Sequence, residues 1–237
     1  MTVREAIKAR HSVRQFKDMA IREEDREELQ DLIEVCNRES GLNIQLICDD
    51  PECFSTFMAK YGKFKNANNY VALVGPKDME DLAESCGYYG QRIVLAAQML
   101  GLNTCWVAGS YGKGKCKADH EKGEKLVCVI ALGYGETEGV PHKTKPMSKL
   151  CDVPEEEMPV WFKNGVIGAM LAPTALNQQK WRVTLDGEEA KITTKMGPMT
   201  KIDLGIVKYN FEAASGHKVW AGREDHVWKE EKSEEDL

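Results

Sequence analysis

The sequence predicts an α+β fold in which a mixed β-sheet is flanked by helices. Apolar residues recur at helical spacing over long segments, and the strongest of these is 82–100. Short apolar runs typical of buried strands lie between the helices, at 70–75 and 126–132. A two-residue Asp186-Gly187 turn between two further strands predicts a hairpin near the C-terminal end.

The first half of the chain begins with a short helix at 3–9. A longer helix follows at 23–38, where apolar residues recur every three or four positions and Gly41 ends the pattern. A strand at 43–48 comes next, then a helical stretch that begins at Pro51 and runs to about 63. The strand 70–75 closes with Gly75-Pro76, a strong turn former.

The helix 82–100 carries one apolar stripe, and Gly101 stands where a left-handed residue is expected to end it. Strands at 104–107 and 126–132 are separated by a loop rich in Lys and Gly. After a second loop, 133–146, a helix runs from 159 to 172 and Pro173 ends it. The remaining elements are strands at 181–185 and 191–194 and a last helix at 202–215.

Composition and charge restrict the class of protein. Of the 237 residues 42% are hydrophobic and 30% are charged, which is ordinary for a globular protein, and the net charge of -6 argues against nucleic acid as a partner. The first ten residues are rich in charge, and no apolar run is long enough to span a bilayer. We therefore expect a cytoplasmic protein without a membrane partner.

The eight cysteines are expected to be free or buried thiols, because no secretory signal accompanies them. Two spacings resemble metal-ligand pairs, Cys48 with Cys53 and Cys116 with His120. Neither belongs to a four-ligand set of the kind that structural zinc needs, so we predict no metal.

An internal repeat is predicted, since the order helix, Leu-Asn, strand, turn, strand, helix occurs twice. Residues 40–46 parallel 174–180, and 87–101 parallel 204–216. The alternative is that two α+β halves share these patterns by chance. On a duplication the chain divides into an N-terminal half, 1–151, a shorter C-terminal half, 152–222, and a charged tail, 223–237.

Three polar clusters are candidates for a binding site. In the first, Arg10, Ser12 and Arg14 share one face if the segment is extended, and two guanidiniums with a hydroxyl suit a phosphate. A solvated basic turn is the alternative. The second is the pair Lys143 and Lys145, in the loop after an apolar strand.

The third cluster is the segment 172–181, which reads Ala-Pro-Thr-Ala-Leu-Asn-Gln-Gln-Lys-Trp. Proline ends a helix, and three amide side chains follow one another. Amides both donate and accept, so they suit the pyrimidine edge of a flavin, where donors and acceptors alternate. The alternative is a helix end followed by a polar strand start.

These motifs resemble those of the nitroreductase family of FMN enzymes, in particular a subfamily with fused, duplicated halves. Residues 10–14, Arg-His-Ser-Val-Arg, are similar to the family's N-terminal FMN motif. Residues 101–109, Gly-Leu-Asn-Thr-Cys-Trp-Val-Ala-Gly, are similar to its loop beside the flavin N5, and 172–181 resemble its Pro-Ser-x-x-Asn-x-Gln-Pro-Trp segment. The resemblance covers about 3–216 and implies a nitroreductase-like fold.

The resemblance implies that Arg10 and Ser12 hold the FMN phosphate together with Lys143 and Lys145, and that Arg14 lies toward the ribityl and pyrimidine edge. The implied cofactor-binding residues are Arg10, His11, Ser12, Arg14, Trp106, Val107, Ala108, Gly109, Lys143, Lys145, Thr174, Leu176 and Asn177. Two positions depart from the family. Its second basic pair usually includes Arg, which binds phosphate as a fork, and Lys180 stands where it has Pro.

The expected activity is an oxidoreductase that takes hydride from NADH or NADPH through FMN to an electron-poor small molecule, such as a nitroaromatic or a quinone. Arg14 is the candidate electrostatic stabiliser of the reduced flavin. The run Gly133-Tyr134-Gly135 lacks the third glycine and helix of a dinucleotide fold. An FMN storage or sensing module, with residues 113–125 as a lid, is the alternative.

The distribution of the motifs between the two halves predicts how many FMN molecules each chain binds. The phosphate motif occurs only in the first half and the amide-rich segment only in the second, so one chain contains the parts of one site. We expect one FMN per chain, bound by a monomer that imitates a dimer. A homodimer in which Asn177 reaches the flavin of another chain is the alternative.

Overall fold

A computed structural model describes residues 1–219 of the 237. The predicted charged tail, 223–237, lies outside the described residues, as does the end of the predicted C-terminal half. In the described part no helix is long and apolar enough to cross a membrane.

The helices lie close to their predicted positions. Their bounds are α1 Val3–Ala9, α2 Glu23–Ser40, α3 Phe57–Tyr61, α4 Leu82–Met99, α5 Val160–Met170 and α6 Thr200–Ser215. Local chemistry sets their ends: Thr2 and Glu5 form a capping box on α1, and Gly41 ends α2 in the left-handed conformation at φ 72°. Short 3-10 helices are η1 Pro51–Phe54, η2 Lys113–Lys115, η3 Met147–Lys149, η4 Glu155–Glu157 and η5 Ala175–Asn177.

A four-stranded sheet forms the first half of the fold. It consists of β1 Gln45–Ile47, β2 Asn69–Pro76, β3 Asn103–Val107 and β4 Glu124–Gly133, in the order β1-β2-β4-β3. In the two central strands, β2 and β4, long runs of consecutive residues are buried, which explains their continuous apolar sequences. The predicted α+β class is confirmed.

The expected mixed sheet is wrong in one respect, because neighbouring strands pair antiparallel throughout the described residues. Strand β2, helix α4 and strand β3 form a crossover between two strands that run in the same direction. Strand β4 lies between them and runs in the opposite direction. Parallel pairing is confined there to isolated bridges, such as the one between Ser12 and Thr104.

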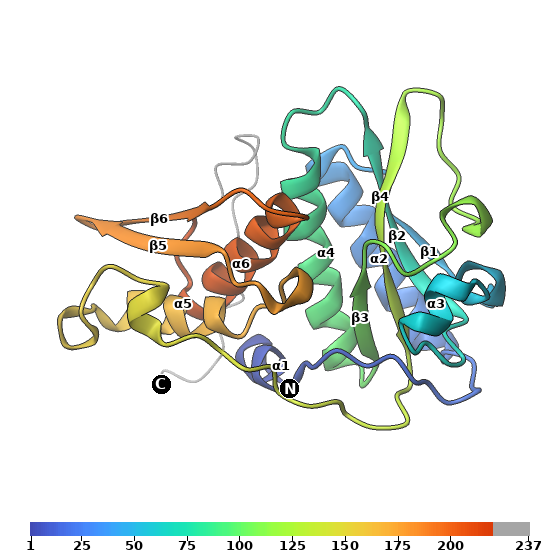
Figure 1. Ribbon diagram of the computed structural model, residues 1–237, viewed down its shortest axis with the longest axis horizontal. Helices are drawn as coiled ribbons and strands as arrows, with labels where there is room; N and C mark the ends of the chain where they lie inside the picture. The colour runs from blue at the N-terminus through green and yellow to red at the C-terminus, as the bar shows by residue number, and fades with distance from the viewer. Residues whose placement is uncertain (220–237) are drawn as a thin grey trace, which may run out of the picture.

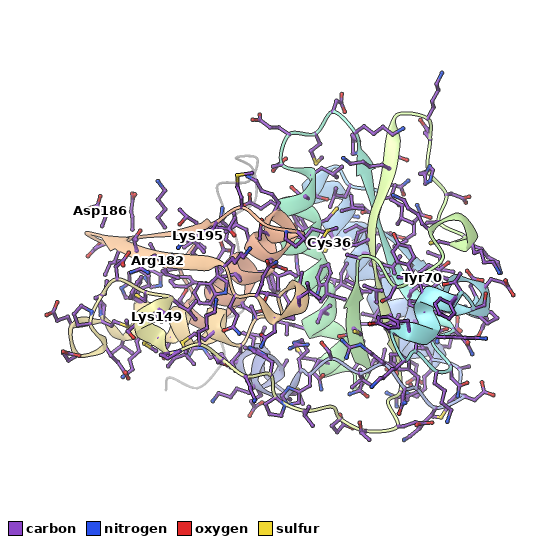
Figure 2. All side chains as sticks on the ribbon, viewed as in Figure 1. Cys36, Tyr70, Lys149, Arg182, Asp186 and Lys195 are labelled. Atoms are coloured by element: carbon purple, nitrogen blue, oxygen red, sulfur yellow. The ribbon has the colours of Figure 1, made fainter. Side chains whose placement is uncertain are left out.

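The second half is a hairpin with two helices. Strands β5 Trp181–Asp186 and β6 Glu189–Thr194 form a separate antiparallel sheet around the predicted turn. Figure 1 shows α4 and α6 side by side between this hairpin and the four-stranded sheet. Figure 2 places Asp186 at the tip of the hairpin and Tyr70 on the opposite side of the molecule.

Helices α4 and α6 cross at glycines. A side-chain carbon on Gly87 would overlap the backbone oxygen of Ile202, and one on Gly205 would overlap that of Glu84. The absence of a side chain at both positions lets the two backbones approach closely. Residues from both halves consequently belong to one continuous hydrophobic core.

The element order agrees with the predicted repeat. Helix α2 is followed by Leu42-Asn43, β1, β2 and α4, and helix α5 is followed by Leu176-Asn177, β5, β6 and α6. The first half contains an insertion, η1 and α3, between its two strands. A common origin of the halves stays a prediction.

Candidate functional site

The N-terminal basic motif follows α1 as an extended segment beside β3. Ser12 forms a parallel bridge with Thr104, and the backbone N–H of Val13 donates to the Thr104 oxygen at 3.0 Å. The side chain of Val13 is buried in the core, which fixes the opposite face of the segment. Because the segment is extended, residues 10, 12 and 14 can share the face opposite Val13, as predicted.

The thiol of Cys105 shows that the alternate residues converge. It is buried, which raises its pKa, while the guanidiniums of Arg14 and Arg10 and the hydroxyl of Ser12 each act in the opposite direction. The side chains at positions 10, 12 and 14 thus all act on one thiol of β3. Sequence reasoning did not single out Cys105, which is one position beyond the bridged Thr104.

Arg10 is the most unusual member of the group. It is 4% exposed, and its guanidinium has no hydrogen bond or ion pair within the described residues. Its Nε atom is buried and without a partner, and burial lowers the pKa of the side chain to about 10. A buried cation without a counterion is costly, so this position favours a bound anion.

The loop 134–146 connects the basic motif with the amide-rich segment. Gly139 adopts φ 74° and packs so closely on the motif that a side-chain carbon would meet the Cβ of His11. His142 Nε2 lies 3.1 Å from the Met170 oxygen, and burial lowers its pKa, with a further contribution from Arg10. His11 and His142 are further polar groups close to Arg10.

The predicted second basic pair lies at the end of this loop. The backbone oxygen of Lys143 accepts from Asn177 Nδ2 at 2.8 Å and from Gln179 Nε2 at 2.9 Å. Lys145 donates its ammonium to the backbone oxygens of Gln178 and Gln179, at 2.7 and 3.0 Å. The structure therefore joins both lysines to the amide-rich segment. Lys143 keeps an exposed ammonium without a described partner, whereas that of Lys145 is already in use.

The amide-rich segment is held in an unfavourable backbone conformation. Leu176, Asn177 and Gln179 have φ values of 54°, 52° and 44°, a region that residues other than glycine rarely adopt. Each such residue costs on the order of 1 kcal/mol, and strained residues of this kind cluster at functional sites. Leu176 is 92% exposed, so the strain holds an apolar side chain out in solvent.

Three hydrogen bonds, to the side chains of Thr174 and Asp203, support this conformation. Thr174 Oγ1 accepts from the Gln179 N–H at 3.1 Å. Asp203, in the first turn of α6, accepts from the Ala175 N–H at 2.8 Å and from Gln178 Nε2 at 2.7 Å. Burial raises the pKa of Asp203 to about 6, although both hydrogen bonds oppose that shift. The role of Asp203 was missed because nothing in its local sequence indicates this partner.

The residues that the family resemblance places beside the flavin N5, 106–109, lie at the end of β3. Trp106 Nε1 donates to Gln91 Oε1 at 3.2 Å, and Gln91 Nε2 donates to Asn210 Oδ1 at 2.9 Å. Val107 is buried, so only its backbone can face a ligand, whereas Ala108 and Gly109 are exposed. A side-chain carbon on Gly109 would meet no atom within 4 Å.

The segment after Gly109, which we considered as a lid, is fastened at its start. The Gly112 N–H donates to the Cys53 oxygen at 2.7 Å, and Lys115 Nζ lies 2.9 Å from Glu52 Oε2. These contacts hold 112–115 against η1. They argue against a lid that opens along the whole of 113–125.

The fold and site define an α+β protein in which Arg10, buried and without a partner among residues 1–219, lies near β3, and a strained amide-rich segment is hydrogen-bonded to the loop 134–146. A family model described as "Putative TM nitroreductase" matches residues 2–215, and the chain belongs to this nitroreductase family. A search of the curated proteins gave no match.

Solved structures show the same fold. A putative nitroreductase from Thermotoga maritima is 23% identical, with a TM-score of 0.66 over 90% of this chain and 83% of that one. A putative nitroreductase from Desulfovibrio desulfuricans, solved in complex with FMN, is 20% identical, with a TM-score of 0.50 over 66% of this chain and 98% of that one.

Proposed function

We propose that this protein is an FMN-dependent oxidoreductase that transfers electrons from NADH or NADPH to an electron-poor small molecule. The observation that carries the proposal is the buried guanidinium of Arg10, which lacks an anionic partner among residues 1–219 and lies close to the same thiol, Cys105, as Ser12 and Arg14. A phosphate monoester satisfies such a group with charge-assisted hydrogen bonds. Membership of the nitroreductase family and the FMN of the Desulfovibrio desulfuricans protein support the same cofactor.

The residues present fit FMN. Arg10 and Ser12 would hold its phosphate, and Lys143 would add charge from the loop. The ammonium of Lys145 already binds two backbone oxygens, so its part is to position the loop. Arg10, Ser12 and Lys143 suit the single terminal phosphate of FMN, and nothing in this group suits the adenosine of FAD.

The remaining site residues would surround the ring system. Bound FMN supplies two-electron chemistry at its ring, and the protein supplies position and electrostatics. Trp106, Val107, Ala108 and Gly109 would lie along one edge, with backbone N–H groups as donors. Thr174, Leu176 and Asn177 would form the opposite side, where the strained backbone fixes their directions in advance. Arg14, which is exposed, is the group we assign to stabilising negative charge on the reduced ring.

Two measurements test the proposal. Mass spectrometry of the cofactor released from purified protein is expected to find FMN, and FAD or no flavin after reconstitution would contradict it. Anaerobic mixing with NADH and with NADPH is expected to bleach the flavin rapidly with at least one donor. Bleaching by dithionite but by neither nucleotide would favour the storage module instead.

We propose further that one FMN binds per chain, within a monomer. The candidate residues come from both halves of one chain, and hydrogen bonds link the segment 174–179 with Lys143 and Lys145. Sedimentation combined with flavin absorbance is expected to give a flavin-loaded monomer. If Arg10→Ala and Asn177→Ala variants, each poor in flavin, regain FMN when mixed, the site is shared between chains.

A further inference from the structure

One buried amide side chain holds the loop 134–146 at two points. Asn103, the first residue of β3, is 3% exposed. Its Oδ1 accepts from the backbone N–H of Gly135 at 2.8 Å, and its Nδ2 donates to Glu138 Oε2 at 2.9 Å. Both polar groups of the side chain are therefore used on the loop, as a buried amide requires.

The same loop runs along the N-terminal basic motif. Gly135 forms an antiparallel bridge with Phe16, just after the motif. Further along the loop, Gly139 packs so closely on the motif that a side-chain carbon there would meet the Cβ of His11. The loop therefore follows the N-terminal segment in the opposite direction before it reaches Lys143.

Strand β3 holds the loop and the motif through neighbouring residues. Thr104, which follows Asn103, bridges with Ser12, and its backbone oxygen accepts from the Val13 N–H at 3.0 Å. The contact between Asn103 and the loop is close, since a side-chain carbon on Gly135 would lie 2.7 Å from Asn103 Oδ1. The loop and the motif are thus attached side by side to the start of one strand.

We propose that Asn103 is a positioning residue for the phosphate end of the flavin site. It acts through the loop, because its two hydrogen bonds keep the loop, and with it Lys143, beside Arg10 and Ser12. Residues that hold a binding group from behind set its geometry without touching the ligand. The inference rests on the proposed FMN function, since the position of the loop affects binding only if a phosphate lies there.

The donor and acceptor of the Asn103 and Glu138 pair can be exchanged to test this role. Asn103→Asp keeps an acceptor for the Gly135 N–H but places a second carboxylate against Glu138, so the loop loses a donor and is repelled. Adding Glu138→Gln returns a donor, whose amide can bind the introduced carboxylate. Glu138→Gln alone is the matched control, because its amide oxygen still accepts from Asn103.

Flavin fluorescence gives the Kd of each full-length variant for FMN and for riboflavin, the same flavin without the phosphate. Because a hydrogen bond to a charged group is lost, Asn103→Asp should weaken FMN binding by about 10-fold. Riboflavin binding should not change, since the amide-rich segment keeps its own hydrogen bonds to Thr174 and Asp203. The double variant should regain the wild-type affinity for FMN, and Glu138→Gln alone should keep it. A general loss of stability would not be reversed by the exchanged pair.

Hydrogen exchange of 134–139 in flavin-free protein reads the loop directly. It should be faster in Asn103→Asp and return to the wild-type rate in the double variant. Unchanged exchange, an unchanged FMN affinity, or no recovery in the double variant would overturn the role of Asn103. If Asn103→Asp does not fold, the double variant must still fold and bind FMN as the wild type does. Wild-type protein that binds neither flavin would instead contradict the proposed function, whatever the exchange rates, so the two failures are distinguishable.

Discussion

The side-chain amide of Asn177 donates to the backbone oxygen of Lys143 at 2.8 Å, and so joins the strained amide-rich segment to the loop that carries the second basic pair. Asn177 also has φ 52°, which asparagine tolerates better than most residues. One residue thus serves the backbone conformation and the contact between two predicted motifs.

Substitution of Asn177 should separate these two roles. Asn177→Ala loses the hydrogen bond and places alanine at positive φ, so we expect the free energy of unfolding to fall by about 1–2 kcal/mol. Asn177→Gly loses the same bond but relieves the backbone, and should cost less. Urea unfolding measures both, and equal losses would show that the backbone conformation carries no strain.

Asp203 should make stability depend on pH. Its pKa rises from 3.8 to about 6 on folding, so the folded state favours the protonated form, and this contribution to stability is lost as the pH rises from about 4 to about 6. At about 1.4 kcal/mol per pKa unit the loss is at most about 3 kcal/mol.

Asp203→Asn removes the titrating group and keeps one acceptor for the Ala175 N–H. Relative to wild type, the variant should gain stability between pH 4 and pH 6 in denaturant titrations made at each pH. A difference between the two proteins that stays constant over this range would contradict the raised pKa.

The crossing of α4 and α6 should not tolerate a side chain. Gly87→Ala and Gly205→Ala each place a carbon against backbone oxygens of the facing helix, and such overpacking costs about 1–3 kcal/mol or more. Gly123→Ala is the control, since a carbon there meets no atom within 4 Å. Thermal unfolding should show a lower Tm for the first two variants and little change for the third. A Tm unchanged in all three would mean that the helices cross less closely.

The buried chain of polar groups from Trp106 through Gln91 to Asn210 should act as a unit. Gln91→Leu keeps a similar volume but leaves both the Trp106 Nε1 and the Asn210 Oδ1 without their partner. Leaving buried polar groups unpaired costs about 1–3 kcal/mol each. Asn210→Leu added to Gln91→Leu should therefore cost less than the sum of the single changes. Additive losses would show that the groups are independent.

Local patterns predicted most of the fold. The helix expected at 82–100 is found as α4. It was predictable because the signals that define it, the apolar stripe and Gly101, lie within or next to the segment itself. The stretch expected at 51–63 instead divides into η1 and α3, since Thr56 Oγ1 accepts from the Ala59 N–H and starts a new helix there. Whether this stretch forms one helix or two is decided by the Thr56 side chain, and a pattern of apolar residues does not reveal that.

The site was predictable only where its residues lie within short motifs. Residues 10–14 and 172–181 stand out in the sequence, and the loop 134–146 contacts both, through Gly139 at His11 and through Lys143 and Lys145 at the amide-rich segment. The residues that support the site were not predictable in this way, because their hydrogen-bond partners are far away in the sequence. Asp203 lies 28 positions from its partner Ala175, and Gln91 lies 119 positions from its partner Asn210. Those partners follow from how α6 packs, and their local sequences show only a helix.

The most direct test of the central claim compares FMN with riboflavin, which lacks the phosphate, as ligands of the apoprotein. Flavin fluorescence gives the Kd of each for wild type, for Arg10→Met and for a control, Lys8→Met, which removes an exposed cation of α1. Charge-assisted hydrogen bonds contribute about 1.5–3 kcal/mol, so Arg10→Met should weaken FMN binding by about 10- to 100-fold and leave riboflavin binding unchanged. The control should alter both ligands little. Equal loss of FMN and riboflavin affinity in Arg10→Met, or no loss of FMN affinity, would show that the phosphate does not bind at Arg10.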